Sequence, residues 1–301
     1  MISQVEGLSK ALNINFSHHT VKLKPFWNLI PPKFTPISEN LLTEKLICNS
    51  KIIISCGRKS VIHSIALKKR FKKDIFNIHI QDPKVSLENF DLIICPEHDN
   101  LRGDNVITTV GAIHYLTKNE IDKNSKYIKI DKENKKLVSF ILGGPNKYYD
   151  YSEQQIDIVF NKVKTLFTPD KYKLIIIPSY RTPEQIIKKA YNTFSHNHLV
   201  FKNVDKNAYL SSLSISDFIV ITCDSTSMIS ESAATGKPIY VVNMPPIRNN
   251  NRFKNFYTQF KKLDIIRDLE DNVNIWNYDQ LDEANRIAPI IKERMKSNGI
   301  I

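Results

Sequence analysis

The residues of this sequence best suited to chemistry lie in three loops of its second half. The first loop reads LGGPN, over residues 142–146. Its adjacent glycines, Gly143 and Gly144, allow backbone N–H groups to approach an anion without a Cβ in the way, and Asn146 closes the loop. The same letters also occur in a plain turn, so the motif alone leaves both interpretations open.

The second loop begins the segment CDSTSMISESAATGKP, residues 223–238, in which hydroxyl-bearing residues follow directly on an apolar run. A helix starting at Asp224 or Ser225 would present unpaired N–H groups and the positive end of its dipole to a phosphate, with Ser225 and Ser227 as further donors. Glu231 lies four residues after Ser227, on the same helix face, where it could accept hydrogen bonds from a ribose. The alternative is that Asp224 or Ser225 only caps the helix and Glu231 is solvated.

The third loop, PSYRTP at residues 178–183, carries Arg181, whose guanidinium can pair with a phosphate or carboxylate through two hydrogen bonds. Many loop arginines have no such role. All three loops follow predicted strands, and the carboxyl ends of parallel strands meet at one edge of a sheet. We therefore expect the three loops to surround a single pocket suited to phosphate groups.

The first half offers candidates for a general base. Asp82 follows one predicted strand, and His98 and Asp99 follow another, in the run PEHD. Histidine titrates near neutral pH, and an adjacent carboxylate can tune it, so this pair could accept a proton from a hydroxyl. The alternative is a hydrogen-bonded loop histidine. A weaker phosphate-friendly turn, CGRKS, also lies in this half.

The elements that must position these residues follow an alternating pattern. Short apolar runs alternate with amphipathic segments, which indicates an α/β fold with parallel sheets. The predicted strands are residues 51–55, 76–80, 91–95, 105–108, 137–142, 173–177, 199–202, 218–222 and 239–243. Residues 118–136 are charged and rich in turn formers, and they mark the boundary between two Rossmann-like domains, 1–134 and 135–278. We expect a cleft between them, with a final helix within 279–301 packing back on the first domain.

Length and composition exclude several classes of protein. The 301 residues suffice for two domains, and 42% hydrophobic and 25% charged residues are typical of globular proteins. The formal charge of +12 favours anionic partners. Four scattered cysteines, Cys48, Cys56, Cys95 and Cys223, suggest neither a zinc site nor a disulfide framework. Since no apolar run approaches the length of a membrane span, we expect a cytoplasmic protein, soluble or peripheral on the inner face of the membrane.

Two basic and aromatic stretches stand apart from the three loops. They are residues 22–34, KLKPFWNLIPPKF, and residues 248–262, which contain five cations and no acid. Aromatic side chains beside lysines suit a membrane surface that bears anionic lipid. The alternative is that the aromatics are buried and the lysines extend to solvent. A nucleic-acid partner is not expected, because no known nucleic-acid-binding motif is present.

The residues as a whole resemble a known family. Eight segments resemble, in the same order, those of bacterial members of the mitochondrial-fission elongated-mitochondria (ELM) family. The segments are GRKS, HIQDP, FDLIICPEHD, NVITTVGAIHYLT, LGGPNKYYDYS, PSYRTP, AYLSSLSISDFIVITCDSTSMISESAATGKP and DEANRIAPIIKERM. That family is similar to GT-B glycosyltransferases. The resemblance implies a diphosphate near Gly143, Gly144, Ser225 and Ser227, a ribose near Glu231, and charge neutralisation by Arg181. On the acceptor side it implies Gly57, Arg58, Lys59 and Gln81.

Members of that family usually open with a strand and a glycine loop before the segment that resembles SQVEGLSKALN, whereas here Met1 directly precedes it. We therefore expect the first sheet to lack its leading strand. Either the start was assigned late, at an internal methionine, or this form is impaired.

These observations favour a glycosyltransferase that uses a nucleoside diphosphate sugar and an unknown acceptor, for which a lipid-linked molecule is one candidate. Such an enzyme needs no metal and no cofactor beyond the sugar nucleotide. The first alternative is a non-catalytic scaffold of the ELM family that binds membranes. The second is a nucleoside diphosphate sugar epimerase; a dinucleotide-dependent epimerase is not expected, because no strand followed by GxxGxxG opens the chain. The oligomeric state, the sugar and the stereochemistry are not encoded in any motif.

Overall fold

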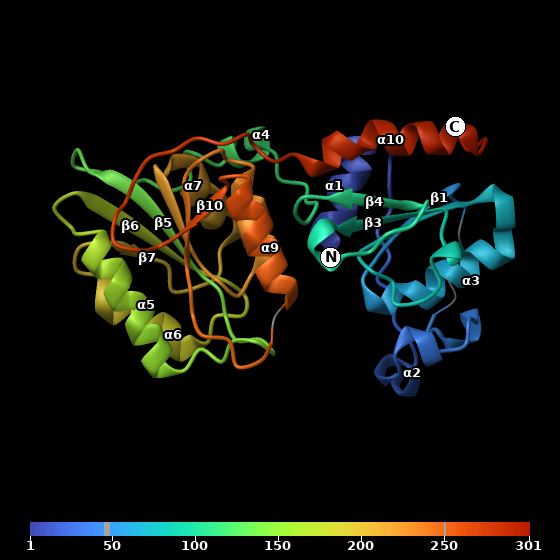
Figure 1. Cartoon of the computed structure of the whole chain (residues 1–301), viewed down its shortest axis with the longest axis horizontal. Coiled ribbons are helices and arrows are strands. Elements are labelled where there is room, and N and C mark those ends of the chain that lie inside the picture. The colour runs from blue at the N-terminus through green and yellow to red at the C-terminus, as the bar shows by residue number, and fades with distance from the viewer. Residues whose placement is uncertain (45–48, 250) are drawn as a thin grey trace. The chain divides into compact units, whose positions relative to one another are not determined.

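Two parallel β-sheets organise the chain in the computed structural model, which describes residues 1–44, 49–249 and 251–301. Cys48 and Asn250, the latter within the basic stretch 248–262, lie outside the described residues. The chain divides into unit 1, residues 1–115 and 282–301, and unit 2, residues 116–281. The α/β fold with two Rossmann-like units and parallel sheets is confirmed (Figure 1).

Unit 1 contains a four-stranded sheet of order β1-β2-β3-β4, all parallel. Its strands are β1 (Ile52–Cys56), β2 (Phe76–Ile80), β3 (Leu92–Pro96) and β4 (Val106–Thr109). Its helices are α1 (Ile2–Leu12), α2 (Pro25–Leu29), α3 (Val61–Phe71) and α10 (Glu283–Ser297). Among the described residues, the first strand of this sheet is β1, which follows α1 in the chain.

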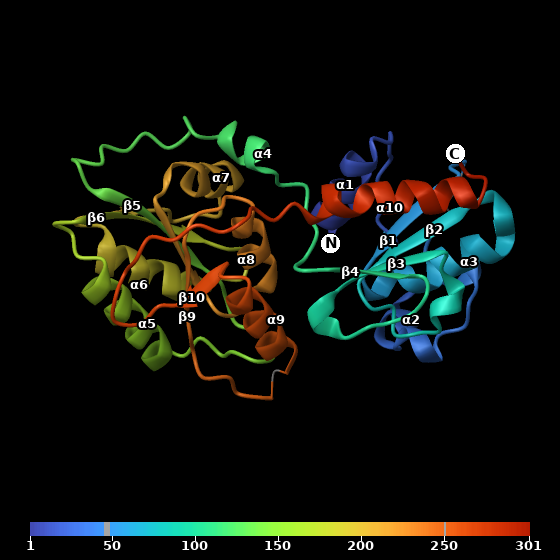
Figure 2. The same ribbon diagram turned by 45° about the horizontal axis from the view of Figure 1, so that its top comes forward.

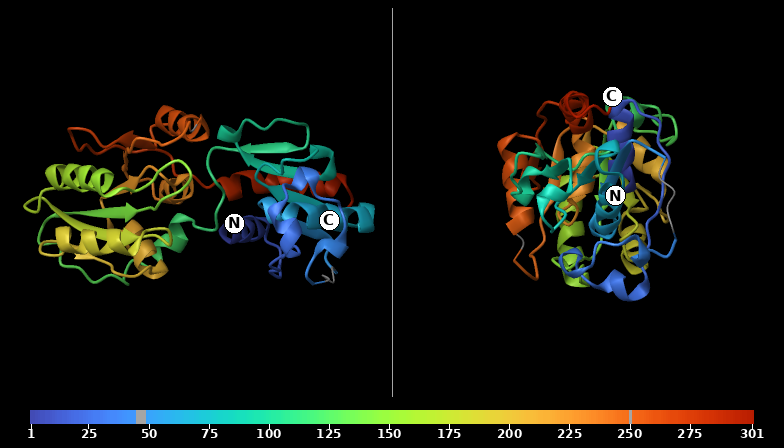
Figure 3. Two further views of the ribbon diagram at one scale, coloured as in Figure 1. Left: turned by 90° about the horizontal axis from the view of Figure 1, so that it is seen from below. Right: turned by 90° about the vertical axis from the view of Figure 1, so that its right-hand side faces the viewer.

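Alternating side chains of β3 show how this sheet is covered. Leu92 and Ile94 pack in a core with α1 and α10, whereas Ile93 and Cys95 pack in a core with α3. Successive side chains of a strand point to opposite faces, so a strand covered on both sides must be apolar throughout. The run LIIC meets this requirement. Figures 2 and 3 show the resulting three layers.

Unit 2 contains a six-stranded parallel sheet of order β10-β9-β8-β5-β6-β7. Its strands are β5 (Lys136–Leu142), β6 (Tyr172–Pro178), β7 (Leu199–Val200), β8 (Phe218–Thr222), β9 (Ile239–Val242) and β10 (Ile266–Asp268). Its helices are α4 (Lys118–Asp122), α5 (Glu153–Leu166), α6 (Glu184–Phe194), α7 (Lys206–Ile215), α8 (Thr226–Ala233) and α9 (Asn251–Lys262).

Both faces of this sheet are covered. Phe140 of β5 packs edge to face on Phe160 of α5 and Phe194 of α6. On the opposite face, the neighbouring Ser139 hydrogen-bonds Ser212 of α7 at 2.8 Å. In Figure 2, α5 and α6 lie on one side of the sheet and α7 on the other. The central strands are therefore held rigidly, and their carboxyl ends form a fixed edge.

The boundary between the units differs from the sequence-based one. The sequence divides the chain after residue 134, whereas residues 116–134 pack within unit 2. Two contacts explain the difference: Asp122 of α4 accepts a hydrogen bond from Ser214 at 2.8 Å, and the backbone N–H of Ile128 donates to Ser211 at 3.0 Å. The stretch that looks like a linker by charge is thus anchored to α7. The predicted returning helix is α10, which packs in the core of unit 1.

The basic stretch 248–262 forms α9, an amphipathic helix. Its three phenylalanines, Phe253, Phe256 and Phe260, are buried, and Phe256 and Phe260 stack at 4.0 Å between ring centroids. Its aromatic side chains are therefore core residues, while Lys254, Lys261 and Lys262 face solvent. Over the described residues, every helix is too short or too polar to cross a bilayer.

Candidate functional site

Three loops of unit 2 meet at the carboxyl edge of its sheet. They follow β5, β6 and β8, which end at Leu142, Pro178 and Thr222. The strands are parallel and adjacent, with Leu142 opposite Pro178, so the loops must leave from the same edge. The convergence expected for LGGPN, PSYRTP and the segment after β8 is thus present in the structure.

The carboxylate of Asp224 lies at the point where the loops meet. Its side chain has no exposed surface. Arg181 Nη2 is 2.7 Å from Asp224 Oδ2, and the backbone N–H of Gly144 donates to the same oxygen at 3.0 Å. The hydroxyl groups of Thr222 and Tyr151 donate to Oδ1, Thr222 at 2.7 Å. A buried carboxylate requires this many donors, because each lone pair left unmatched costs free energy.

The two glycines are required by close packing. A Cβ on Gly143 would overlap the Asp224 carboxylate, and a Cβ on Gly144 would overlap the backbone carbonyl of Arg181. Their N–H groups already have acceptors: Gly143 donates to Thr222 Oγ1 at 2.8 Å and Gly144 to Asp224. In this structure the glycine loop binds its own sheet edge, and its N–H groups do not point at an open anion site.

Arg181 connects the three loops while remaining partly accessible. Its Nη1 donates to the Gly144 carbonyl at 2.9 Å, and 40% of its side chain is exposed. Asn146 also belongs to this junction, because its Nδ2 donates to the Asp224 carbonyl at 3.1 Å and its Oδ1 accepts from the Tyr148 N–H at 2.7 Å. The charge of Arg181 is therefore balanced by Asp224, and only its outer edge can meet a ligand.

The N-terminus of α8 lies beside this junction. Ser225 is the N-cap, with its Oγ accepting from the Met228 N–H at 3.4 Å, so Ser225 and not Asp224 has the capping role that the sequence left open. The N–H groups of Thr226 and Ser227 begin the helix without an intrahelical acceptor. Ser227 is exposed, so its hydroxyl and N–H can meet a ligand from solvent.

Glu231 lies one turn further along α8, as its spacing from Ser227 requires. It is half-buried, and its Oε2 accepts a hydrogen bond from the Tyr209 hydroxyl at 2.9 Å. A carboxylate can accept more than two hydrogen bonds, so Tyr209 fixes the orientation of Glu231 and leaves it able to accept from a further hydroxyl.

The ionisable side chains around Asp224 have raised pKa values. Burial and the adjacent Asp224 charge raise the pKa of Tyr151 well above its usual value, and burial does the same to the pKa of Tyr257. Burial raises the pKa of Cys223 to about 12. These groups therefore stay protonated at neutral pH and act as hydrogen-bond donors or packing groups, not as nucleophiles.

Sequence analysis does not identify three residues of this junction. Tyr151 binds Asp224 from a backbone with φ of 60°, which a tyrosine rarely adopts. Thr222 donates to Asp224, and Thr182 Oγ1 donates to the Gly143 carbonyl at 2.6 Å. Of the three, only Thr182 has a signal in the sequence, because it is next to Arg181. A single hydroxyl residue forms no sequence motif that would indicate its role.

The predicted acceptor-side residues of unit 1 follow β1 and β2. Gly57 has a φ of 79° and is buried, and Arg58 Nη2 donates to the Leu29 carbonyl at 3.0 Å. Lys59 is exposed. Gln81 donates from Nε2 to Gln4 at 3.0 Å. These residues line the carboxyl edge of this sheet, with Arg58 and Gln81 engaged by neighbouring segments of unit 1.

The three candidate general bases differ in accessibility. The side chain of His98 is 1% exposed, with Nε2 3.9 Å from Asp99 Oδ1. Asp99 is 12% exposed and also lies 3.7 Å from the Cys95 thiol. Asp82 is 16% exposed and binds the Lys84 ammonium at 2.5 Å. A general base must reach its substrate, so His98 is poorly placed in this conformation and the two carboxylates are better exposed.

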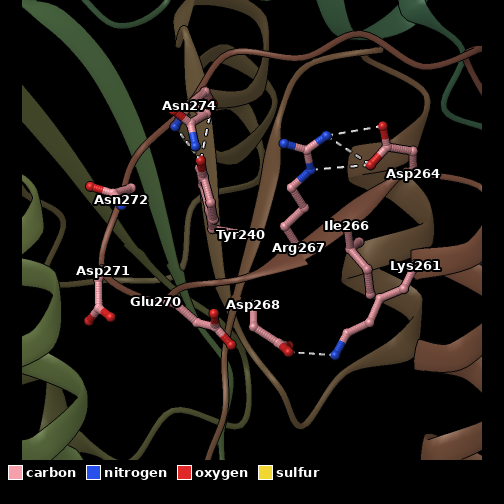
Figure 4. Close-up of a pocket in the computed structure, with 10 residues that line it drawn as sticks. All are labelled: Tyr240, Lys261, Asp264, Ile266, Arg267, Asp268, Glu270, Asp271, Asn272 and Asn274. Atoms are coloured by element: carbon pink, nitrogen blue, oxygen red, sulfur yellow. Dashed lines mark hydrogen bonds and ion pairs between the residues drawn. The ribbon is translucent and has the colours of Figure 1, made fainter.

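A hollow of about 480 Å³ lies elsewhere in unit 2, around β10 (Figure 4). Its cations are paired: Lys261 with Asp268 at 2.5 Å, and Arg267 with Asp264 at 3.0 Å. Glu270 and Asp271 add two further carboxylates to its lining. The hollow contains none of the predicted site residues, and its excess of carboxylates does not suit a phosphate ligand. Among the described side chains, no group of three or more histidines, cysteines or acids could hold a metal ion.

Residues 1–295 match the model of the family described as mitochondrial fission ELM1. The chain belongs to this family. Among the relatives of this ELM1-family chain is the Arabidopsis thaliana mitochondrial fission protein ELM1, 26% identical over 282 residues, which cover 82% of this chain and 64% of the plant protein. An uncharacterised Rickettsia prowazekii protein, RP120, is 26% identical over 287 residues, 82% of this chain and 80% of that one.

Solved structures similar to the ELM1-family chain include sugar-nucleotide enzymes. The S. aureus MnaA structure with UDP has a TM-score of 0.49 at 13% identity and covers 83% of this chain and 75% of its own. UDP-GlcNAc 2-epimerase from Neisseria meningitidis, bound to UDP-GlcNAc, has a TM-score of 0.47 at 13% identity, with coverage of 82% and 76%. MurG of Acinetobacter baumannii has a TM-score of 0.44 at 12% identity, with coverage of 83% and 67%.

Proposed function

We propose that unit 2 binds a nucleoside diphosphate sugar at the carboxyl edge of its sheet and that the protein transfers the sugar to an acceptor. The observation that carries this proposal is the convergence of three loops on Arg181, whose partly exposed guanidinium lies between the Gly144 carbonyl and Asp224. Ser227 and the first turn of α8 are the donors beside it. Such groups favour paired phosphates and would stabilise a departing diphosphate.

In this proposal the ligand contacts differ from those of a simple glycine-loop site. The N–H groups of Gly143 and Gly144 stay bound to Thr222 and Asp224, so the diphosphate is held by the outer edge of Arg181, Ser227 and the N–H groups that begin α8. Glu231, oriented by Tyr209, accepts a hydrogen bond from the ribose.

Activation of the acceptor is assigned to unit 1. The carboxylates of Asp82 and Asp99, 16% and 12% exposed, are more accessible than His98 and are the candidates for removing the acceptor proton, whereas His98 would require a movement that opens its environment. No metal or other cofactor is needed for this scheme, because cationic and N–H groups supply the charge stabilisation. A lipid-linked acceptor would place the protein at the inner face of the membrane.

Calorimetric titration with UDP and with several nucleoside diphosphate sugars tests the proposal. We expect binding to weaken about tenfold or more in Arg181→Gln and in Glu231→Gln, since each substitution removes a charged side chain that would hydrogen-bond the ligand. Lys188→Gln is a matched control, because Lys188 is an exposed cation of unit 2 that pairs with Glu184 on α6. If no nucleotide binds, or if all three variants bind as the parent does, the proposal fails.

Product analysis separates transfer from the alternative reaction. An epimerase converts the donor sugar without an acceptor, whereas a transferase releases nucleoside diphosphate only when an acceptor is present. Binding without either product would leave a non-catalytic protein of the ELM1 family that retains a nucleotide site.

A further inference from the structure

A closed loop of unit 1, residues 24–41, extends beyond α3 and carries α2 (Figure 1). The segments on either side of it pair with each other: the Lys24 N–H donates to the Leu41 carbonyl at 2.8 Å, and the Thr43 N–H donates to the Lys22 carbonyl at 3.0 Å. Leu23 and Leu42 form an antiparallel bridge between these segments and are buried. The base of the loop is therefore fixed to unit 1.

The loop is also ordered by its own contacts. The Phe34 N–H donates to the Pro31 carbonyl at 2.9 Å, and the buried hydroxyl of Thr35 donates to the same carbonyl at 3.0 Å. Arg58, from the turn after β1, donates to the Leu29 carbonyl at 3.0 Å. Four prolines within 24–41 restrict the backbone further. The side chains of the loop are thus displayed in defined positions.

This ordered loop displays large apolar side chains to solvent. Phe26 is 66% exposed, Leu29 is 80% exposed and Phe34 is 71% exposed. Trp27 is half-buried, with its ring edge to face with Phe26 at 5.1 Å. None of the residues of α2 is buried. Three such side chains within nine residues, each at least 66% exposed, indicate a surface that meets an apolar partner.

The charges around these side chains select the kind of partner. Lys24 and Lys33 flank the apolar positions within the loop, and Lys59 follows Arg58, the residue that holds the loop at Leu29. All three lysines are exposed. The single acid of the loop, Glu39, is bound to Arg70 of α3 at 3.2 Å. The solvent-facing charge beside Phe26, Leu29 and Phe34 is therefore positive.

We propose that residues 24–37 form a docking loop that inserts Phe26, Leu29 and Phe34 into the surface of an anionic lipid bilayer. Phenylalanine, leucine and tryptophan suit the boundary between headgroups and acyl chains, while lysines meet the acidic headgroups. The structure favours this loop over α9, whose phenylalanines are buried in unit 2. The inference is independent of the nucleotide proposal, since it involves no residue of unit 2.

Tryptophan fluorescence gives a direct test. The chain has two tryptophans: Trp27 on α2, and Trp276, which is buried in unit 2 against Tyr240. In Trp276→Phe, emission reports the docking loop alone. With phosphatidylcholine vesicles that contain phosphatidylglycerol, we expect the Trp27 emission to shift to the blue and to be quenched by brominated acyl chains. Pure phosphatidylcholine should give a smaller change, and salt should weaken the effect.

Flotation of the full chain with the same vesicles measures affinity. Replacing Phe26, Leu29 and Phe34 together by serine should lower binding at least about tenfold, because these side chains supply the buried apolar area. The matched control replaces Ile158, Ile275 and Ile290, which are 60%, 65% and 41% exposed elsewhere, by serine. Lys24→Gln with Lys33→Gln should lower binding about fivefold for each charge removed.

Three outcomes would overturn the inference: no binding of the parent chain to anionic vesicles, equal binding by the triple serine variant, or binding without a change in Trp27 emission. The last result would place the lipid contact on another surface. The first would leave the loop as a contact for a protein, which crosslinking from position 29 could identify. Nucleotide titration of the triple variant separates this outcome from a failure of the proposed sugar-nucleotide site.

Discussion

Arg181 and Asp224 form an ion pair of 2.7 Å in which the carboxylate is fully buried and the guanidinium is 40% exposed. The pair joins the loop after β6 to the loop after β8. A buried charge that loses its partner is expensive, so the position of Arg181 is controlled by Asp224. The same interaction that orients the guanidinium also neutralises it, which limits Arg181 to ligands that can use its remaining hydrogen-bond donors.

We expect Asp224→Asn to destabilise unit 2 by about 3–5 kcal/mol, since the amide cannot accept from Gly144, Thr222 and Tyr151 while facing Arg181. Urea unfolding followed by Trp276 emission in Trp27→Phe measures this change. Tyr151→Phe removes a single donor and should cost about 1–3 kcal/mol. Should Asp224→Asn unfold at the same urea concentration as its parent, Asp224 does not organise the junction.

The core of both sheets could be predicted from the sequence because buried parallel strands read as continuous apolar runs. FIVIT over β8 and LIIC in β3 are such runs. The edge strand β10 has the sequence IRD, with Arg267 and Asp268 half-buried. Because two of its three residues are charged, it is not a continuous apolar run and cannot be predicted in this way. The sequence places the domain boundary after residue 134, whereas unit 2 begins at residue 116, because the hydrogen bonds of this charged stretch with α7 leave no periodic pattern in the sequence.

The candidate site was predictable only in part. Parallel strands fix where their following loops lie, so the meeting of the residues near 143, 181 and 224 follows from the order of elements. The orientation of Asp224 does not. An acid next to a helix start resembles a cap, but Ser225 takes that role and Asp224 turns inward to Tyr151, an interaction between positions 73 residues apart. Local sequence carries no signal for such a contact.

The glycines of the loop after β5 should tolerate no side chain. In Gly144→Ala the new methyl group would overlap the Arg181 carbonyl, a backbone atom that cannot move without shifting its loop. We expect a loss of about 3 kcal/mol or more in the stability of unit 2, together with a loss of any nucleotide binding. Gly103→Ala is the control, because the atoms nearest its Cβ would be side-chain atoms, of Leu87 at 3.0 Å, Val106 at 3.3 Å and Asn105 at 3.5 Å, and not backbone atoms. A parent-like Gly144→Ala would contradict the packing described here.

Lowering the pH should reduce the folding stability of unit 1, because a buried histidine resists protonation in the folded state. Burial lowers the pKa of His79 from 6.5 to about 4, while its Nδ1 pairs with the Ser55 hydroxyl at 2.8 Å. Between these pH values the unfolded chain binds the proton and the folded chain does not, so stability falls as pH falls through this window, by about 3 kcal/mol in total. Burial also lowers the pKa of His63, which acts in the same direction.

Unfolding of Trp276→Phe at several pH values, followed by Trp27 emission, measures this effect. His79→Gln should flatten the dependence between pH 6.5 and 4, even if it lowers stability at neutral pH. His198→Gln is the comparison, because burial lowers the pKa of that histidine of unit 2 to about 4 as well. In Trp27→Phe it should alter the acid response reported by Trp276, and in Trp276→Phe it should leave the acid response reported by Trp27 in place. The reverse result would contradict the assignment of the acid sensitivity of unit 1 to His79.

The C-terminal helix α10 should stabilise unit 1, although the rest of that unit, residues 1–115, lies at the other end of the sequence. Ile291 of α10 is fully buried in the core shared with α1 and β2, and Glu283 accepts from the Val110 N–H at 2.7 Å while binding Arg286. We expect Ile291→Ala to cost about 2–5 kcal/mol through the cavity it leaves. The loss should appear in hydrogen exchange of β2 and β3, with β5 and β6 unchanged. The exposed Ile290→Ala, one residue away, should have little effect, because its side chain fills no core space. Equal protection of β2 in both variants would mean that α10 is dispensable for unit 1.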